Sequence, residues 1–183
     1  LKATGSPVQI RSLVTIGTPW QGSYLADFAD DAVPLSACGG DQFCQDQMRG
    51  YDKDVAMAYP SGSAHELAAG YLKGWNTFQA GALDNIAVTL IAGTRFQRPG
   101  DPVVWPNDGI VALRSALAMD IGDPVLPHRR CYTFDDTHSI YVSNAAGLDW
   151  KTALTWDPQV FDVGRDAIEN APKALEGPNR EGC

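Results

Sequence analysis

The stretch Ile86–Ala92, IAVTLIA, is a continuous apolar run in a chain of 183 residues. Ser12–Ile16 (SLVTI) and, less clearly, Arg129–Phe134 (RRCYTF) have the same character. Apolar runs without polar alternation are typical of strands that are buried on both faces of a parallel sheet. The three runs therefore predict strands of a sheet that is covered on both sides.

Helical patterns separate and follow these runs. We expect helices over Cys44–Ala58, Ser63–Leu72 and Ile110–Met119, and another that begins at Asp157-Pro158, lets Phe161, Ile168 and Ala171 share a face, and stops at Pro172. Asp157 and Pro158 form an N-cap and first-turn pair, and Ser63 with Glu66 has capping-box spacing. Strands that alternate with helices predict an α/β fold with a mostly parallel sheet flanked by helices.

The segment 23–84 lies between two predicted strands and is longer than a plain crossover requires. It contains helical stretches, glycines, prolines and two cysteines, but no predicted strand. We interpret it as a helical, lid-like insertion over the sheet. A longer crossover of two helices is the alternative interpretation.

Composition and charge exclude several classes of partner. The net charge of −8 argues against nucleic acid, which binds basic surfaces. No apolar run approaches the roughly 20 residues that span a bilayer, so we expect no transmembrane segment. No signal peptide is visible at Leu1. We therefore expect that one was removed or that the chain belongs to a longer protein.

The four cysteines permit three pairings. We favour Cys38–Cys44, which closes a short loop, and Cys131–Cys183, which ties a polar tail to the body. On the loop-entropy model these bridges contribute roughly 2 and 4 kcal/mol. Four free thiols in a reducing compartment are the alternative. Disulfides favour an oxidising compartment, and hence a secreted, extracellular protein.

Three motifs occur in order along the chain. They are Ser12–Ser23 (SLVTIGTPWQGS), Pro106–Ala116 (PNDGIVALRSA) and Phe134–Tyr141 (FDDTHSIY). Together they resemble the bacterial secreted lipase/esterase family of the α/β-hydrolase superfamily, over about residues 10–146. The resemblance implies that the chain is the C-terminal portion of a single α/β-hydrolase domain.

The resemblance assigns roles to four residues. Asp108 is the expected acid and His138 the expected base of a Ser-Asp-His triad, in the order that the superfamily uses. Thr18 and Trp20 are expected to shape the substrate entrance. An N-cap role for Asp108 and a surface position for His138 are the plainer alternatives. Asp101, His65 and His128 are weaker candidates for the same roles.

The nucleophile elbow G-x-S-x-G does not occur in this sequence. Ser63 in Gly62-Ser63-Ala64-His65 is the nearest match, and a helix cap explains it better. The family pattern would place the serine and the oxyanion hole in an N-terminal segment of the same hydrolase. Strand 12–16 would otherwise be an unpaired apolar edge, which promotes aggregation. We therefore expect the chain to be stable only with that N-terminal partner.

The expected reaction is hydrolysis of a carboxylic ester in a lipid or smaller ester substrate, by acyl transfer and without an organic cofactor. A thioesterase or an acyltransferase with the same triad is one alternative. A non-catalytic, hydrolase-like binding module is another. Asp135 and Asp136 are weak candidates for a structural calcium site near His138.

Overall fold

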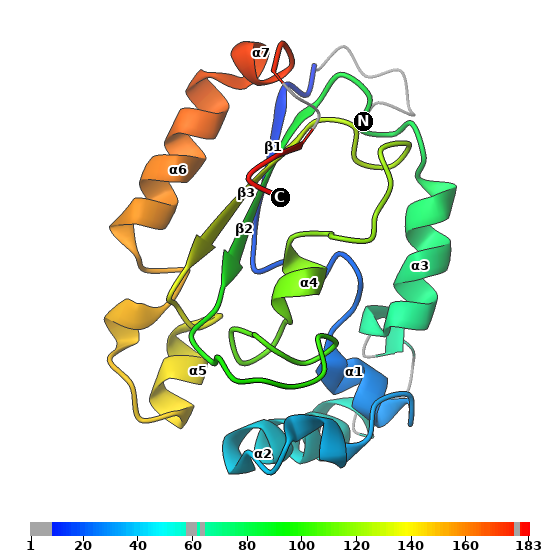
Figure 1. Cartoon of the computed structure of the whole chain (residues 1–183), viewed down its shortest axis with the longest axis vertical. Helices are drawn as coiled ribbons and strands as arrows, with labels where there is room; N and C mark the ends of the chain where they lie inside the picture. The colour runs from blue at the N-terminus through cyan, green and yellow to red at the C-terminus, as the bar shows by residue number, and fades with distance from the viewer. Residues whose placement is uncertain (1–8, 58–61, 63–64, 178–179) are drawn as a thin grey trace.

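The computed structural model describes residues 9–57, 62, 65–177 and 180–183. Within these ranges, parallel strands form one sheet in the order β1-β2-β3-β4 (Figure 1). The strands are β1 (Ser12–Ile16), β2 (Ala87–Gly93), β3 (Arg129–Phe134) and the short β4 (Arg180–Glu181). The structure is therefore a mixed α/β fold, and β1 and β3 have the predicted bounds.

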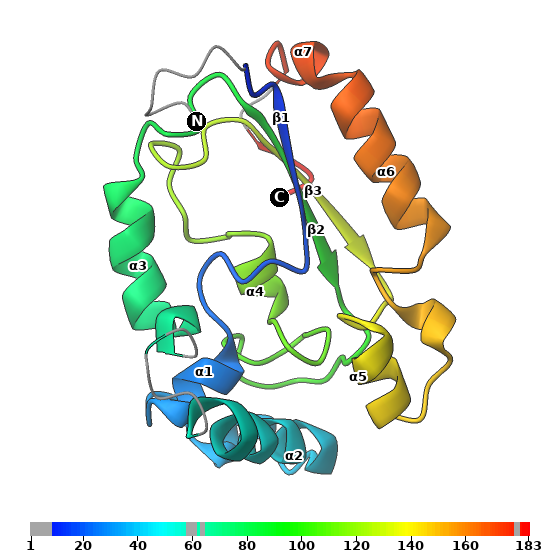
Figure 2. The same ribbon diagram turned by 180° about the vertical axis from the view of Figure 1, so that it is seen from behind.

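The helices cover both faces of the sheet. Figures 1 and 2 show α3 (Ala69–Phe78) and α4 (Leu113–Ala116) on one side, and α6 (Pro158–Glu169) with α7 (Ala171–Ala174) on the other. At the carboxyl end of the strands lie α1 (Tyr24–Ala29), α2 (Gln42–Tyr51) and α5 (Ile140–Ala145). Short 3-10 helices span Leu35–Cys38, His65–Leu67 and Trp150–Thr152, and a π-helical turn spans Asp52–Ala56. No helix of the described ranges is long and apolar enough to cross a membrane.

Strand β2 is buried along its whole length because it has a hydrophobic cluster on each face. Leu90 belongs to the cluster that includes Leu126. Ile91 points the other way and packs with Leu154 and Val160, the latter from α6. This arrangement accounts for the continuous apolar run in the sequence.

Two helix boundaries differ from the sequence prediction for physical reasons. The helix expected from Ile110 starts only at Leu113, because the Asp108 side chain accepts the N–H groups of Ile110 and Val111 and holds them in a loop. The helix expected from Cys44 starts at Gln42, because Asp41 is its N-cap. It ends as an α-helix at Tyr51 and continues in the π-helical turn.

The helix predicted over 63–72 is replaced by a 3-10 turn and then by α3. Ser63 lies outside the described residues. The α3 N-terminus is capped from a distance, because Asp27 accepts a hydrogen bond of 2.7 Å from the Ala69 N–H. Sequence spacing does not reveal this cap, since Asp27 lies 42 positions away.

Helix α6 starts as predicted, with Asp157 accepting a hydrogen bond from the Gln159 N–H. It ends at Glu169, and Pro172 lies in the first turn of α7 rather than beyond a helix end. The predicted shared apolar face is only partly buried. Ala171 is buried, whereas Phe161 and Ile168 are 54% and 66% exposed.

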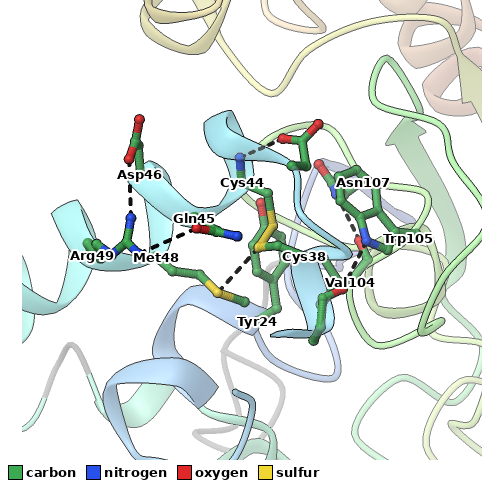
Figure 3. The surroundings of a disulfide bond; sticks show 12 residues. Tyr24, Cys38, Cys44, Gln45, Asp46, Met48, Arg49, Val104, Trp105 and Asn107 are labelled. Atoms are coloured by element: carbon green, nitrogen blue, oxygen red, sulfur yellow. Dashed lines mark hydrogen bonds and ion pairs between the residues drawn. A yellow bond between two sulfur atoms is a disulfide. The ribbon is translucent and has the colours of Figure 1, made fainter. Parts of the chain in front are cut away.

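Both cysteine pairs that the spacing favours are formed, as Cys38–Cys44 and Cys131–Cys183. The first bridge lies in a hydrophobic cluster with Tyr24, Met48 and Trp105 (Figure 3). Trp105 Nε1 also donates a hydrogen bond of 3.1 Å to the Ala37 carbonyl. The segment 23–84 therefore shares a core with the loop that leads into Asp108.

Candidate active site

Three loops meet where the parallel strands end. Gly17 directly follows β1, Asp108 lies in the long loop after β2, and His138 lies in the loop after β3. The structure brings the two predicted catalytic side chains together, with 2.9 Å between His138 Nδ1 and Asp108 Oδ2. The two residues also share a backbone hydrogen bond of 2.8 Å, from the His138 N–H to the Asp108 carbonyl.

The Asp108 carboxylate is fully buried and both of its oxygens have partners. Oδ1 accepts hydrogen bonds of 2.9 and 2.7 Å from the N–H groups of Ile110 and Val111. Oδ2 is thereby directed at His138. Asp108 is not the N-cap of α4, because Ala112 occupies that position. It shapes its own loop with one oxygen and holds the imidazole with the other.

The segment after β1 also holds the loop 94–112, which carries the predicted acid Asp108 and is called the acid loop below. The Tyr24 hydroxyl donates a hydrogen bond of 3.0 Å to the Gly109 carbonyl, and the Ser23 hydroxyl donates one of 2.6 Å to the Ile110 carbonyl. Gly109 has a φ of 100°, and a β-carbon there would lie 2.4 Å from Val142 Cγ1. A glycine is therefore required after Asp108 by space as well as by backbone conformation.

The His138 side chain is 29% exposed. Burial lowers the pKa of this imidazole, but the hydrogen bond that Nδ1–H donates to Asp108 and the negative charge of Asp108 outweigh burial and leave the pKa above its ordinary value. Among the described residues, Asp108 is the sole hydrogen-bond partner of the ring. Nε2 is thus free to accept a proton from a nucleophile.

The glycine that follows the strand in the first motif, Gly17, lies directly against His138 and Asp108. Its φ is +59°, and a β-carbon at this position would lie 2.8 Å from His138 Nδ1 and 3.2 Å from Asp108 Oδ2. Gly93 makes a similar close approach, with its β-carbon position 2.8 Å from Asp108 Cβ. Neither position can carry a side chain without moving Asp108 or His138.

Thr18 and Trp20 lie in the turn after β1. Trp20 Nε1 donates a hydrogen bond of 3.2 Å to Thr15 Oγ1, and the Trp20 carbonyl accepts one of 2.6 Å from Asn76 of α3. The Thr18 carbonyl accepts a hydrogen bond from the Trp20 N–H. These contacts give Trp20 a structural role between β1 and α3, and contact of either residue with substrate stays a prediction.

The weaker candidates for the acid, base and calcium-binding roles make other contacts or none. Asp101 is exposed and accepts a hydrogen bond from the Val103 N–H. His65 pairs with Asp30, and the buried His128 Nδ1 has no partner among the described residues. Asp135 forms a salt bridge of 2.8 Å with Arg95. The described parts of the chain contain no group of three or more His, Cys, Asp or Glu side chains that could hold a metal ion.

Comparison with models of known protein families, with curated proteins and with solved structures gives no match.

Replacing Gly17 with alanine tests the close approach of the first motif. We expect Gly17→Ala to displace the His138 ring and to lower the stability by about 1 to 3 kcal/mol, since a side chain at positive φ is strained as well. Chemical unfolding measures the stability, and NMR titration of the His138 ring measures its displacement.

Gly39→Ala is the matched control, because Gly39 has a φ of +58° and nothing within 4 Å of its β-carbon position. Gly39→Ala should lower the stability, because alanine is strained at positive φ, but it should leave the His138 titration unchanged. Equal effects of both variants on the His138 ring would contradict the proposed packing.

Removing the charge of Asp108 tests the origin of the His138 pKa. In Asp108→Asn, burial remains while the charge that offsets it is lost, so the His138 pKa should fall below its ordinary value. NMR titration of the ring reports this value directly. Asp101→Asn serves as the control and should leave the His138 pKa in place.

Proposed function

We propose that this chain supplies the acid and the base of a secreted α/β-hydrolase of the lipase/esterase kind, which hydrolyses carboxylic esters. The observation that carries the proposal is the Asp108–His138 pair, with a buried carboxylate on Nδ1 and an open Nε2 at the ends of parallel strands. Catalytic pairs in α/β folds lie at this end of the sheet. The residue order of the motifs adds to this support.

We assign each member of the pair a role that its geometry allows. A serine hydroxyl placed near Nε2 attacks the ester carbonyl, and His138 takes the hydroxyl proton as general base. Asp108 keeps the proton on Nδ1 and stabilises the imidazolium that forms. His138 then protonates the leaving alkoxide and activates the water that cleaves the acyl-enzyme. This chemistry requires no organic cofactor.

We propose that the serine comes from an N-terminal segment of the same hydrolase, which adds to the free edge of β1. Within the described residues, β1 pairs only with β2, so its other edge has no partner strand. A cavity of about 390 Å³ lies beside that edge. Its apolar lining includes Val14 and Ile16 of β1 and Phe161 and Ile168 of α6.

The segment 23–84 is proposed as a helical insertion that frames the entrance to the site. Its hydrophobic cluster around Cys38–Cys44 includes Val104 and Trp105 of the acid loop. The two disulfides support a protein that is folded in an oxidising compartment and secreted.

Active-site labelling tests the catalytic proposal in the protein expressed from its complete coding sequence. We expect a fluorophosphonate to label a serine outside these 183 residues, and p-nitrophenyl esters to be hydrolysed. His138→Ala should abolish both reactions, and Asp108→Asn should lower kcat by about 10⁴-fold, as loss of a triad carboxylate does elsewhere.

His65→Gln is the matched control and should retain labelling and turnover. Parallel assays with acyl-CoA and with an alcohol acceptor distinguish a thioesterase or acyltransferase that uses the same pair. Full labelling in His138→Ala would refute the catalytic role, and a folded protein without any labelling would favour a binding module.

The open edge of β1 leads to a prediction about the isolated chain. We expect residues 1–183 alone to self-associate, because an unpaired apolar strand edge recruits other strands. Phe161→Ser with Ile168→Ser should reduce this association, measured by light scattering. A soluble monomer that unfolds cooperatively without any added segment would contradict the proposed N-terminal partner.

A further inference from the structure

Two peptide groups of the acid loop donate hydrogen bonds to the Asp108 carboxylate. The first peptide group joins Gly109 to Ile110, and its N–H lies 2.9 Å from Asp108 Oδ1. The second joins Ile110 to Val111, and its N–H lies 2.7 Å from the same oxygen. Because a peptide group is rigid, whatever binds its carbonyl also affects the direction of its N–H.

A hydroxyl from the segment after β1 reaches each of the two carbonyls. The Tyr24 hydroxyl donates a hydrogen bond of 3.0 Å to the Gly109 carbonyl, which belongs to the first peptide group. The Ser23 hydroxyl donates one of 2.6 Å to the Ile110 carbonyl, which belongs to the second. Two consecutive residues thus bind two consecutive peptide groups that lie 87 and 85 positions away in the sequence.

Both hydroxyls are buried and held in place by other contacts. Tyr24 is 2% exposed, and its ring packs in the hydrophobic cluster of the Cys38–Cys44 disulfide (Figure 3). Ser23 is also 2% exposed and is the N-cap of α1. Among the described residues, no other hydrogen-bond donor reaches either carbonyl. Loss of the Tyr24 hydroxyl would therefore leave the buried Gly109 carbonyl without a donor.

Hydroxyl, peptide group and carboxylate oxygen form a chain in which each donor points the same way. A hydroxyl that donates to a carbonyl polarises the peptide group and makes its N–H a better donor. This strengthening is only about 10 to 30% per bond. The geometric effect is larger, because a peptide group that is bound at both ends cannot rotate its N–H away from Asp108 Oδ1.

We propose that Tyr24 and Ser23 are positioning residues for the acid, and that they hold the Asp108 carboxylate in its orientation toward His138 through these two peptide groups. Their hydroxyls bond to the acid-loop backbone and not to the carboxylate itself. The start of the segment 23–84 thus orients the acid, in addition to the entrance role proposed above.

The consequence for turnover rests on the proposed function. When His138 takes a proton, the imidazolium is stabilised by a carboxylate whose Oδ2 faces Nδ1. If the two peptide groups can rotate, Oδ1 loses its donors and Oδ2 loses its fixed direction. This change lowers kcat. It leaves KM nearly unchanged, because both hydroxyls are buried and donate to the backbone of the acid loop.

Amide hydrogen exchange, measured by NMR on the protein expressed from its complete coding sequence, tests the positioning role. Tyr24→Phe removes one oxygen atom and should speed exchange at the Ile110 N–H by roughly 3- to 10-fold, which corresponds to the loss of one hydrogen bond. Ser23→Ala should have its largest effect at the Val111 N–H. The Leu90 amide in the middle of β2 reports global unfolding and should change less.

Tyr71→Phe is the matched control, because it removes the same atom from a side chain of α3 that is 50% exposed. This variant should leave exchange at Ile110 and Val111 at the parent rates. Exchange that rises equally at Ile110, Val111 and Leu90 in Tyr24→Phe would overturn the positioning role, since it would show only a general loss of stability.

A double-mutant cycle tests whether the Tyr24 hydroxyl acts through the carboxylate. Hydrogen bonds to an ionised acceptor are stronger than those to a neutral one, so neutralising Asp108 should weaken the whole chain of bonds. Tyr24→Phe should therefore reduce the folding equilibrium constant, measured by chemical unfolding, by a smaller factor in the Asp108→Asn background than in the parent. Equal factors in the two backgrounds would contradict a link between Tyr24 and Asp108.

Turnover of p-nitrophenyl esters tests the consequence for the proposed reaction. Tyr24→Phe should lower kcat several-fold with little change in KM, whereas Tyr71→Phe should retain both values. A parent-like kcat in Tyr24→Phe, measured beside an active parent, would overturn the positioning role. A parent protein that hydrolyses no ester would refute the proposed function alone, because the exchange and unfolding measurements decide the role of Tyr24 without turnover.

Discussion

The buried carboxylate of Asp108 is the constraint on which the site depends. A charge that is removed from water has to be surrounded by donors, or the fold that buries it is unstable. Here one oxygen takes the N–H groups of Ile110 and Val111, and the other takes His138 Nδ1. The hydrogen bonds to the two oxygens of this carboxylate therefore determine both the path of the acid loop and the position of the His138 imidazole.

Close approach of three loops around this charge is possible because glycines line the contact. Gly17 at the end of β1 and Gly93 at the end of β2 leave the space that the His138 ring and the Asp108 side chain occupy. The parallel sheet contributes the alignment, since its strands end at the same edge. The parallel sheet thus brings the three loops to one edge, and the glycines leave room for the Asp108 and His138 side chains to meet there.

Much of this arrangement could be predicted from sequence, because it depends on local patterns. Continuous apolar runs located β1 and β2 and, less clearly, β3. The resemblance of three ordered motifs to a known family selected Asp108 and His138 as partners across 30 positions. The shortened helix after Asp108 was not predictable from periodicity, since one side chain competes there for the N–H groups of the first turn. The contact of Tyr24 with Gly109 could not be predicted, because no spacing rule relates such distant positions.

The Cys131–Cys183 bridge has a consequence for the durability of the site. It closes a loop over a sequence separation of 52 positions, and this loop contains His138, α5 and α6. A protease that cuts once between the two cysteines would leave both fragments covalently joined, with the imidazole still attached to β3. A protein built in this way tolerates a nick on its C-terminal side, because the two fragments stay joined until the disulfide is reduced.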